Sequence, residues 1–280
     1  MDSLPIGDYA LLSDCRTAAL VSRVGSVDWL CCPRFDAPAV FARLLDPDGG
    51  HFAIRPAGDF QASRAYVDQT MVLETTFGTQ AGTAVLTDAM AVGRNDRGHH
   101  LGAGSPGVLL RRLTCTVGEI DVDVSYAPRP EYGLIYPILE AVAGGIAARG
   151  GASRLLLSAR AGFQVAGDTA TAQLHLVAGQ TVSFALQYGQ MQEPPLAAWE
   201  AGQIAARLQD TIEDGAPGPL CTRPMRGPGA TWCIIPAGSC RRSRSPRPGP
   251  SWPHPRPRCR RRSAASATGI IATPGCATPA

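Results

Sequence analysis

Short apolar segments separated by polar turns run through residues 1–194. Over residues 120–125, Ile120, Val122 and Val124 alternate with polar residues, which is the period of a strand that buries one face. Comparable segments occupy residues 9–12, 18–22, 27–31, 52–55, 71–77, 83–90, 108–117, 155–158, 171–177 and 181–188. Strand segments at this regular spacing, with few helices between them, predict a mainly β fold built as an antiparallel β-sandwich.

Two segments depart from the strand pattern. After Pro195, apolar side chains such as Trp199 and Leu208 fall near helical spacing in an Ala-rich stretch, which predicts a helix over residues 195–213. Residues 39–45 follow a proline and predict one short helical turn. A long helix that leaves a β domain usually leads to another domain, so we expect the helix over 195–213 to be a linker.

The composition of the chain changes abruptly at Asp214. All 23 acidic residues lie at or before this position, whereas the residues after it contain 11 of the 26 arginines and 13 of the 24 prolines. The formal net charge of +3 is therefore the sum of −8 before the break and +11 after it. A segment rich in Arg, Pro and Ser cannot bury enough apolar surface to fold, so residues 214–280 are predicted to be a disordered tail.

Motifs for metals, cofactors and membranes are missing from the sequence. None of the nine cysteines forms a CxxC pair or shows the spacing of a zinc site, and the glycines of residues 144–151 do not form GxGxxG. We therefore expect no metal and no cofactor. The N-terminus does not resemble a signal peptide, and no apolar run reaches the ~18 residues of a membrane span. A cytoplasmic protein that does not bind membranes is the expectation.

Several segments of the first part resemble the opening of bacterial glycoside hydrolase family 15, the glucoamylase and trehalase-like group. The resemblance lies in IGDYALLSD over residues 6–14, GSVDWLC over 25–31 and PRFDAP over 33–38. It continues in VLETTF over residues 72–77 and TDAM over 87–90, and it extends to about residue 213.

The resemblance implies a specific domain order. Members of this family have an N-terminal antiparallel β super-sandwich, a linker helix and an (α/α)6 barrel that carries catalysis. Residues 1–194 would then form a trehalase-like β-sandwich, and residues 195–213 a linker helix. Residues 214–280 stand where the barrel begins in other members of the family. The family hydrolyses α-glucosidic bonds of trehalose or maltooligosaccharides with inversion, using two glutamates of the barrel. This chain lacks the part of the barrel in which both glutamates lie, so no catalytic residue is assigned to it. We expect an inactive fragment, and only the intact parent protein would bind an α-glucoside substrate.

The tail contains a trace of the missing barrel in a neighbouring reading frame. When the codons of residues 267–279 are read from each third base, permitted wobble choices spell Asn-Trp-Asp-Tyr-Arg-Tyr-Ser-Trp-Leu-Arg-Asp-Ala. This string resembles the sugar-binding motif near the start of the family's barrel. The tail is therefore interpreted as a frame-shifted, truncated barrel.

Two other functions remain as alternatives. The first is a stand-alone carbohydrate-binding or oligomerisation β module. The second is a nucleic-acid binder, because arginines cluster over residues 241–247 and 256–262. Nucleic-acid binding is disfavoured, since the tail holds only two tryptophans and no other aromatic residue to stack on bases.

Arg34 and Asp36 are the candidate site residues, because they lie in a proline-flanked loop within the most family-like stretch. They are interpreted as a substrate-binding or interdomain pair, with a local turn as the simpler alternative. Glu74 and Asp88 are interpreted as solvated charges on the faces of strands, with a carboxylate pair on the hairpin as the alternative. With no barrel to cover it, the apolar stripe of the linker helix is expected to be exposed and to promote homo-oligomerisation.

Overall fold

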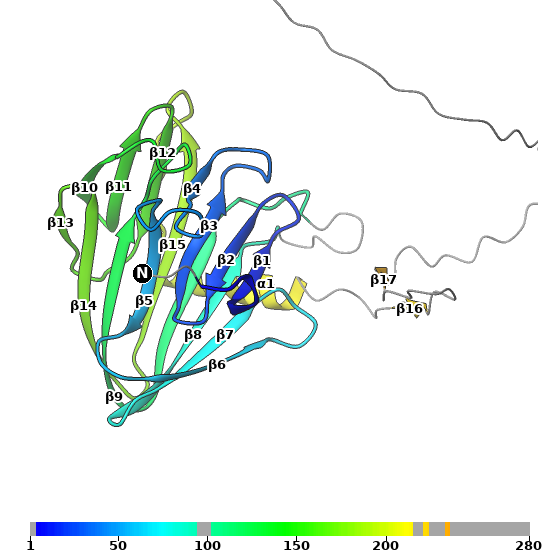
Figure 1. Ribbon diagram of the computed structural model, residues 1–280, viewed down its shortest axis with the longest axis vertical. Coiled ribbons are helices and arrows are strands. Elements are labelled where there is room, and N and C mark those ends of the chain that lie inside the picture. The colour runs from blue at the N-terminus through cyan, green and yellow to red at the C-terminus, as the bar shows by residue number, and fades with distance from the viewer. Residues whose placement is uncertain (1–3, 94–101, 215–220, 224–232, 236–280) are drawn as a thin grey trace, which may run out of the picture. The chain divides into compact units, whose positions relative to one another are not determined.

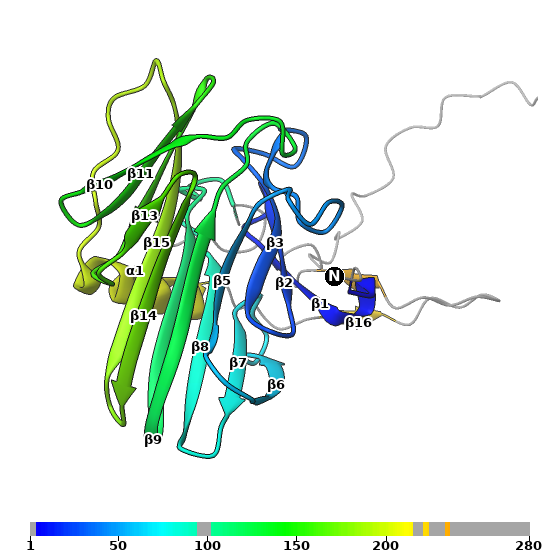
Figure 2. The same cartoon turned by 60° about the vertical axis from the view of Figure 1, so that its left-hand side comes forward.

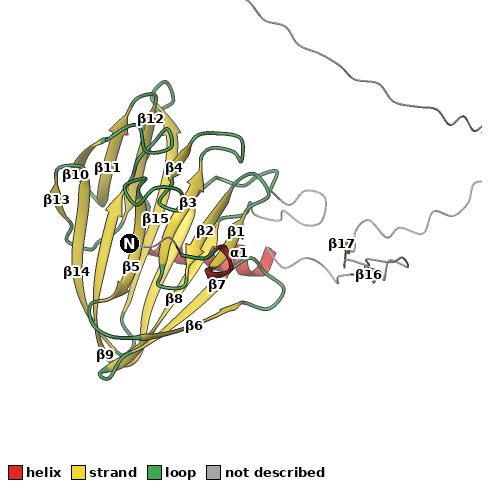
Figure 3. Cartoon of the chain, viewed as in Figure 1, coloured by secondary structure: helices red, strands yellow, loops and turns green. Residues whose placement is uncertain are grey.

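The computed structural model describes residues 4–93, 102–214, 221–223 and 233–235 (Figure 1). A single 3₁₀ turn over Ile6–Asp8 precedes a series of strands, and one α-helix follows them (Figure 3). The strands are β1 Tyr9–Ser13, β2 Ala18–Ser22, β3 Ser26–Cys31, β4 Ala39–Phe41, β5 His51–Pro56, β6 Gln61–Tyr66, β7 Leu73–Gly78, β8 Gly82–Met90, β9 Leu109–Ala127, β10 Ile138–Val142, β11 Gly145–Gly150, β12 Ser153–Ser158, β13 Gln164–Ala166, β14 Thr169–Val177 and β15 Thr181–Gln190. The helix α1 spans Ala201–Asp214. The mainly β, antiparallel fold predicted from the sequence is confirmed.

Two packed layers share one long strand. The first layer contains β1 to β5, β13 and β14, and the second contains β6 to β8, β10 to β12 and β15. Strand β9 is 19 residues long and belongs to both. Its first half pairs with β8 and β15, and its second half pairs with β5 and β14. Figure 2 shows β9 running the length of the sandwich.

Gly118 lies where β9 passes from one layer to the other. Its φ is +64°, in the left-handed region, and a Cβ added there would lie 2.1 Å from the carbonyl oxygen of Ala81. Only glycine fits such a close approach without strain. The sequence predicted two strands, over residues 108–117 and 120–125. This was wrong because the glycine between them bends the strand without ending it.

The core lies between the two layers and is rich in aromatic rings. Phe52 packs edge to face against Tyr126 and Phe184, with ring centroids 5.7 and 5.9 Å apart. All three side chains are fully buried. The alternation that predicted the sandwich is confirmed, since Ile120, Val122 and Val124 all point into this core.

Helix α1 packs on the outer face of the second layer. Ile204 and Leu208 are 2% and 0% exposed, and they form a buried cluster with side chains of that layer. The cluster partners are Val72, Ala89, Ala91, Val108, Leu110 and Ala185. The expectation that the apolar stripe of the helix is exposed was therefore wrong, because the sandwich itself covers it. Homo-oligomerisation stays a prediction, without that stripe to support it.

The helix begins at Ala201, later than the predicted start at Pro195. Residues 195–200 instead run along the sandwich, where the N–H of Trp199 donates to Ser158 Oγ at 3.0 Å. The N–H of Glu200 donates to Gln203 Oε1 at 2.9 Å, which satisfies a free donor at the start of the helix. Apolar spacing predicted the body of the helix correctly but wrongly extended its start to residues 195–200.

Other departures are local. Residues 39–41 form β4, and the predicted helical turn is confined to the chain after it, where the N–H of Leu45 donates to Ala42 O at 2.9 Å. The strands β6, β10, β11 and β13 were not predicted. Of the predicted tail, Asp214 is the last residue of α1, and two further strands, β16 (Cys221–Arg223) and β17 (Cys233–Ile235), pair with each other; residues 215–220, 224–232 and 236–280 lie outside the described residues. In the described part of the chain, no helix combines the length and apolarity that a membrane crossing requires.

Candidate functional site

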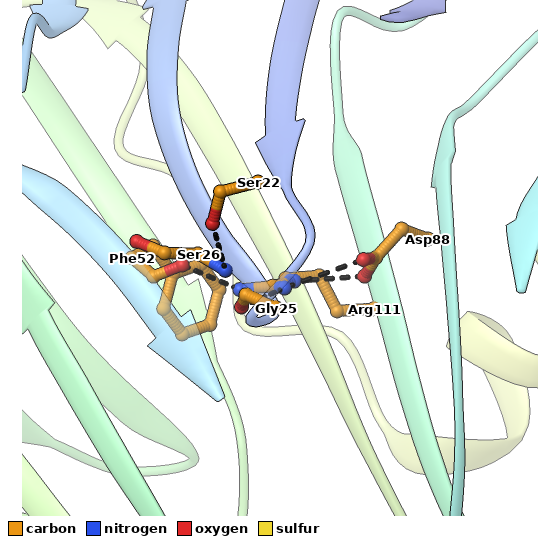
Figure 4. Close-up of polar contacts among 6 residues, drawn as sticks. All are labelled: Ser22, Gly25, Ser26, Phe52, Asp88 and Arg111. Carbon is orange, nitrogen blue, oxygen red and sulfur yellow. Dashed lines mark hydrogen bonds and ion pairs between the residues drawn. The ribbon is translucent and has the colours of Figure 1, made fainter. Parts of the chain in front are cut away.

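A buried arginine joins the two layers of the sandwich. Arg111 of β9 has no exposed side-chain surface, and its Nε and Nη2 donate to Asp88 Oδ1 and Oδ2 at 2.8 and 3.3 Å. Its remaining contacts reach the opposite layer, since Nη1 donates to Phe52 O at 2.5 Å and Nη2 to Gly25 O at 2.7 Å. Figure 4 shows the arginine lying between Asp88 on one side and Gly25 and Phe52 on the other.

The surroundings of Arg111 hold it in one geometry. Its Cζ lies 4.7 Å from the centroid of the Phe52 ring, within the range of a cation–π contact. The turn that presents Gly25 is closed by two hydrogen bonds, from Gly25 N to Ser22 O at 3.0 Å and from Ser26 N to Ser22 Oγ at 3.2 Å. The arginine therefore fastens the β2–β3 turn and β5 to the other layer.

The interpretation of Asp88 as a solvated charge was wrong. Burial raises the pKa of Asp88, and the charge and hydrogen bonds of Arg111 oppose this rise. Because both carboxylate oxygens accept from the guanidinium, the geometry is that of an ion pair. Asp88 also cannot form a carboxylate pair with Glu74. Asp88 lies opposite Leu73 in the β7–β8 register and Glu74 lies opposite Thr87, so the two acids point to opposite faces of the sheet.

Arg34 and Asp36 lie in the loop between β3 and β4 and contact each other. Arg34 Nε is 3.1 Å from Asp36 Oδ1, and the two side chains are 67% and 75% exposed. The loop is fixed by its backbone, where Phe35 N donates to Arg16 O and Ala37 N to Arg34 O, both at 3.1 Å. This tight turn displays Phe35, which is 56% exposed. An exposed ion pair contributes little to stability, ~0–1 kcal/mol.

A second loop exposes more apolar surface. In the β9–β10 loop, Tyr132, Leu134 and Tyr136 are 52%, 82% and 60% exposed. The backbone φ of Glu131 and Tyr132 is +56° and +58°, which is unusual for residues other than glycine. Strained backbone of this kind, ~1–3 kcal/mol per residue, persists only where surrounding contacts impose it and is concentrated at functional sites.

Several contacts impose this loop conformation. The N–H of Tyr132 donates to Ala39 O at 3.1 Å and that of Arg129 to Val40 O at 2.9 Å, which ties the loop to β4. The Tyr132 ring lies 6.3 Å from that of Trp29, and the guanidinium of Arg129 lies 4.6 Å from the centroid of Tyr136. Arg129 in turn pairs with Asp168 at 3.1 Å.

Both loops therefore border β4. We refer to Arg34, Phe35, Asp36, Tyr132, Leu134 and Tyr136 together as the loop surface. Two of these six residues, Arg34 and Asp36, were predicted from the sequence. The tyrosines and Leu134 lie in the stretch PEYGLIY over residues 130–136, which is largely apolar, does not alternate and is bounded by prolines. This pattern indicates a loop with apolar side chains and could have identified them. Among the described residues, no group of three or more His, Cys, Asp or Glu side chains is placed to bind a metal ion.

Comparison with known proteins decides the family. The family model for the trehalase-like N-terminal domain matches residues 1–207 of this chain. The chain belongs to this family. The resemblance noted in the sequence is thereby confirmed for the trehalase-like N-terminal domain, and the narrower placement in glycoside hydrolase family 15 stays a prediction.

Trehalases are similar to this trehalase-like domain over roughly half of the chain. The trehalase of Mycolicibacterium smegmatis is 38% identical over 138 residues, which is 46% of this chain and 21% of that protein. The trehalase of Mycobacterium tuberculosis is 37% identical over 138 residues, covering 46% and 20% respectively. Trehalase 1 of Sulfolobus acidocaldarius is 36% identical over 143 residues, covering 51% and 23%. The chain spans about a fifth of the length of the curated relatives that it matches.

Proposed function

We propose that this chain is the β domain of an inverting glycoside hydrolase of family 15 whose substrate is trehalose, and that the chain alone is inactive. Membership of the trehalase-like N-terminal family carries the proposal, and the names of the matching relatives favour trehalose over a maltooligosaccharide. In this proposal the β domain supports a catalytic domain and does not itself cleave the substrate.

The chemistry of glycosidases supports the proposed inactivity. Cleavage requires a carboxylic acid that protonates the leaving oxygen and a carboxylate on the other side of the scissile bond. Asp88 meets neither need, because it is fully buried and both of its oxygens contact Arg111. Glu74 lies on the other face of the same sheet. Asp88 and Glu74 therefore cannot act together as the acid and the second carboxylate at one glycosidic bond.

The first test is an assay of the purified chain. We expect no release of glucose from trehalose or maltose above that of buffer, measured with a coupled glucose assay. Turnover that exceeds the background and persists through a second purification step would contradict the proposal.

We further propose that the segment after Asp214 is translated in a shifted frame. The composition break at Asp214 and the family-like string hidden in residues 267–279 support this. Resequencing the coding DNA tests it. Insertion or removal of one nucleotide near the codon of Asp214 should open a long frame, and the restored protein should release glucose from trehalose. A stop codon soon after the repaired site in both frames would contradict it.

The loop surface is the part of the β domain that we propose contacts the catalytic domain. Exposed aromatic and aliphatic side chains on a strained but well-tied loop suit an interdomain contact. In the frame-restored protein, replacing Tyr132 and Tyr136 together with serine should accelerate thermal inactivation of trehalase activity. The control is Met191→Ser, since Met191 is also exposed (44%) but lies in the turn after β15. Equal inactivation rates in both variants would exclude the loop surface as the contact.

A further inference from the structure

A pocket of about 300 Å³ lies beside β3, and none of the loop surface residues lines it. Tyr9 of β1, Asp28 of β3 and Arg55 of β5 line it, together with Arg43, Leu45 and other residues of the turn after β4. Its volume is at the low end of the ~300–1,000 Å³ that is typical of ligand sites. A pocket of this size suits a ligand of one ring.

The polar centre of the pocket is the carboxylate of Asp28, which is 4% exposed. Oδ1 accepts from Ser26 Oγ at 2.5 Å and Oδ2 accepts from Tyr9 OH at 3.0 Å. Burial and the charge of Asp28 raise the pKa of Tyr9 to about 12, so the phenol keeps its proton and donates. A carboxylate has about four acceptor sites, and two protein donors leave capacity for a ligand.

The backbone of β3 is distorted to present this side chain. Leu20 of β2 pairs with Trp29 and the next residue, Val21, pairs with Val27, so Asp28 is the extra residue of a β-bulge. Bulges are common next to binding sites, where they redirect a side chain out of the regular alternation. The pocket wall is also tied to this residue, because the N–H of Leu44 donates to Asp28 O at 3.1 Å.

We propose that this pocket binds a single pyranose ring of a neutral carbohydrate. Sugar hydroxyls can donate to the Asp28 carboxylate and accept from the guanidinium group of Arg55, while Leu45 and Pro47 offer apolar contacts for ring C–H groups. Charges of both signs around one small pocket favour a neutral ligand with donors and acceptors over a simple anion or cation.

The site is for binding and not for cleavage. Among the described residues that line the pocket, Asp28 is the single carboxylate, and glycoside hydrolysis uses two. The inference does not depend on the proposed hydrolase function, because it concerns the β domain as it stands.

Binding to the purified chain tests the proposal. Two-dimensional ¹H–¹⁵N NMR spectra are recorded with glucose, trehalose and, as a charged probe, inorganic phosphate. We expect saturable shifts of signals from residues that line the pocket, such as Asp28 and Leu44, with millimolar sugar and none with phosphate. Asp28→Asn removes the charged acceptor at constant size and should weaken sugar binding about tenfold or more, the loss typical of a hydrogen bond to a charged group.

If Asp28→Asn folds poorly, two variants of exposed arginines test the pocket instead. Arg55→Gln changes an exposed side chain of the rim and should weaken binding severalfold, whereas Arg160→Gln changes another exposed arginine, which does not line this pocket, and should leave binding unchanged. No saturable shift with either sugar, an affinity unchanged by Arg55→Gln, or binding of phosphate in place of sugar would each overturn the proposal. A glucose-release assay run on the same sample reports separately on the proposed hydrolase function.

Discussion

Replacing Arg111 with methionine is expected to destabilise the β-sandwich by about 3–5 kcal/mol, the range seen when one partner of a buried ion pair is removed. The carboxylate of Asp88 would stay buried without its partner, and the carbonyl groups of Gly25 and Phe52 would lose a donor that now lies at 2.7 and 2.5 Å. Urea denaturation followed by circular dichroism measures the loss.

The pH dependence of this variant identifies the cause. Burial alone raises the pKa of Asp88, and without Arg111 nothing opposes that rise. Between the ordinary and the raised pKa, the folded state then binds more protons than the unfolded state, so the variant's stability should increase as pH falls through the raised pKa. Relative to the unsubstituted protein, the deficit should shrink toward low pH. A deficit that is constant across this range would show that packing, and not the stranded charge, accounts for the loss.

Two comparisons complete the test of the ion pair. Arg34→Met breaks an exposed pair of the same residue types and should change stability by no more than ~1 kcal/mol. The double replacement of Arg111 by methionine and Asp88 by leucine removes both charges. It should recover part of the loss, because an apolar pair often replaces a buried ion pair without penalty. Recovery should be incomplete, since Phe52 O and Gly25 O each still lack the Arg111 donor, although Gly25 O keeps its bond from Ile54 N at 3.0 Å.

Replacing Leu208 with alanine is expected to cost about 2–5 kcal/mol in the packing of α1, the usual range for a buried leucine. Leu208 is 0% exposed and shares a buried cluster with Ile204 and with Leu110 and Ala185 of the second layer. Because α1 follows the last strand of the sandwich, the loss should appear first as detachment of the helix. Faster hydrogen exchange of the α1 amides, measured by mass spectrometry, would report it.

Neighbouring positions on the same helix provide the controls for Leu208. Gln209→Ala changes an exposed side chain and should alter stability by less than ~0.5 kcal/mol. Leu208→Met keeps the volume and should cost less than ~1.5 kcal/mol. Unchanged exchange of α1 in Leu208→Ala would contradict the packing of the helix on the sandwich.

The sandwich was predictable because its signal is local. Strands such as β2 and β8 are short, largely apolar segments bounded by turns, and the structure places them within a residue or two of the predicted bounds. The start of α1 was missed because the N–H of Trp199 donates to Ser158 Oγ, in β12, and this bond holds Trp199 outside the helix. The pattern of apolar residues over 195–213 cannot predict this contact, because Ser158 lies 41 residues earlier in the chain.

The polar features of the structure were largely hidden from sequence reasoning. Arg111 contacts residues 23, 59 and 86 positions away, so its fixed geometry arises only when two layers come together. Asp28 looked like an ordinary strand residue, since nothing in its neighbours predicts a bulge. Arg34 and Asp36 were found from their proline-flanked loop, but the tyrosines that share their surface lie about a hundred residues further along the chain.

The shared strand β9 makes cooperativity a built-in property of this domain. Unfolding of either layer breaks the strand pairing of one half of β9. Both layers should therefore unfold in a single two-state transition. Fluorescence and circular dichroism should report the same midpoint for it. Its pairing partners lie far apart in sequence, from β5 to β15, which predicts a high contact order and slow refolding. The pairing of β9 with β15 also means that the second layer can be completed only after residue 190 has been synthesised.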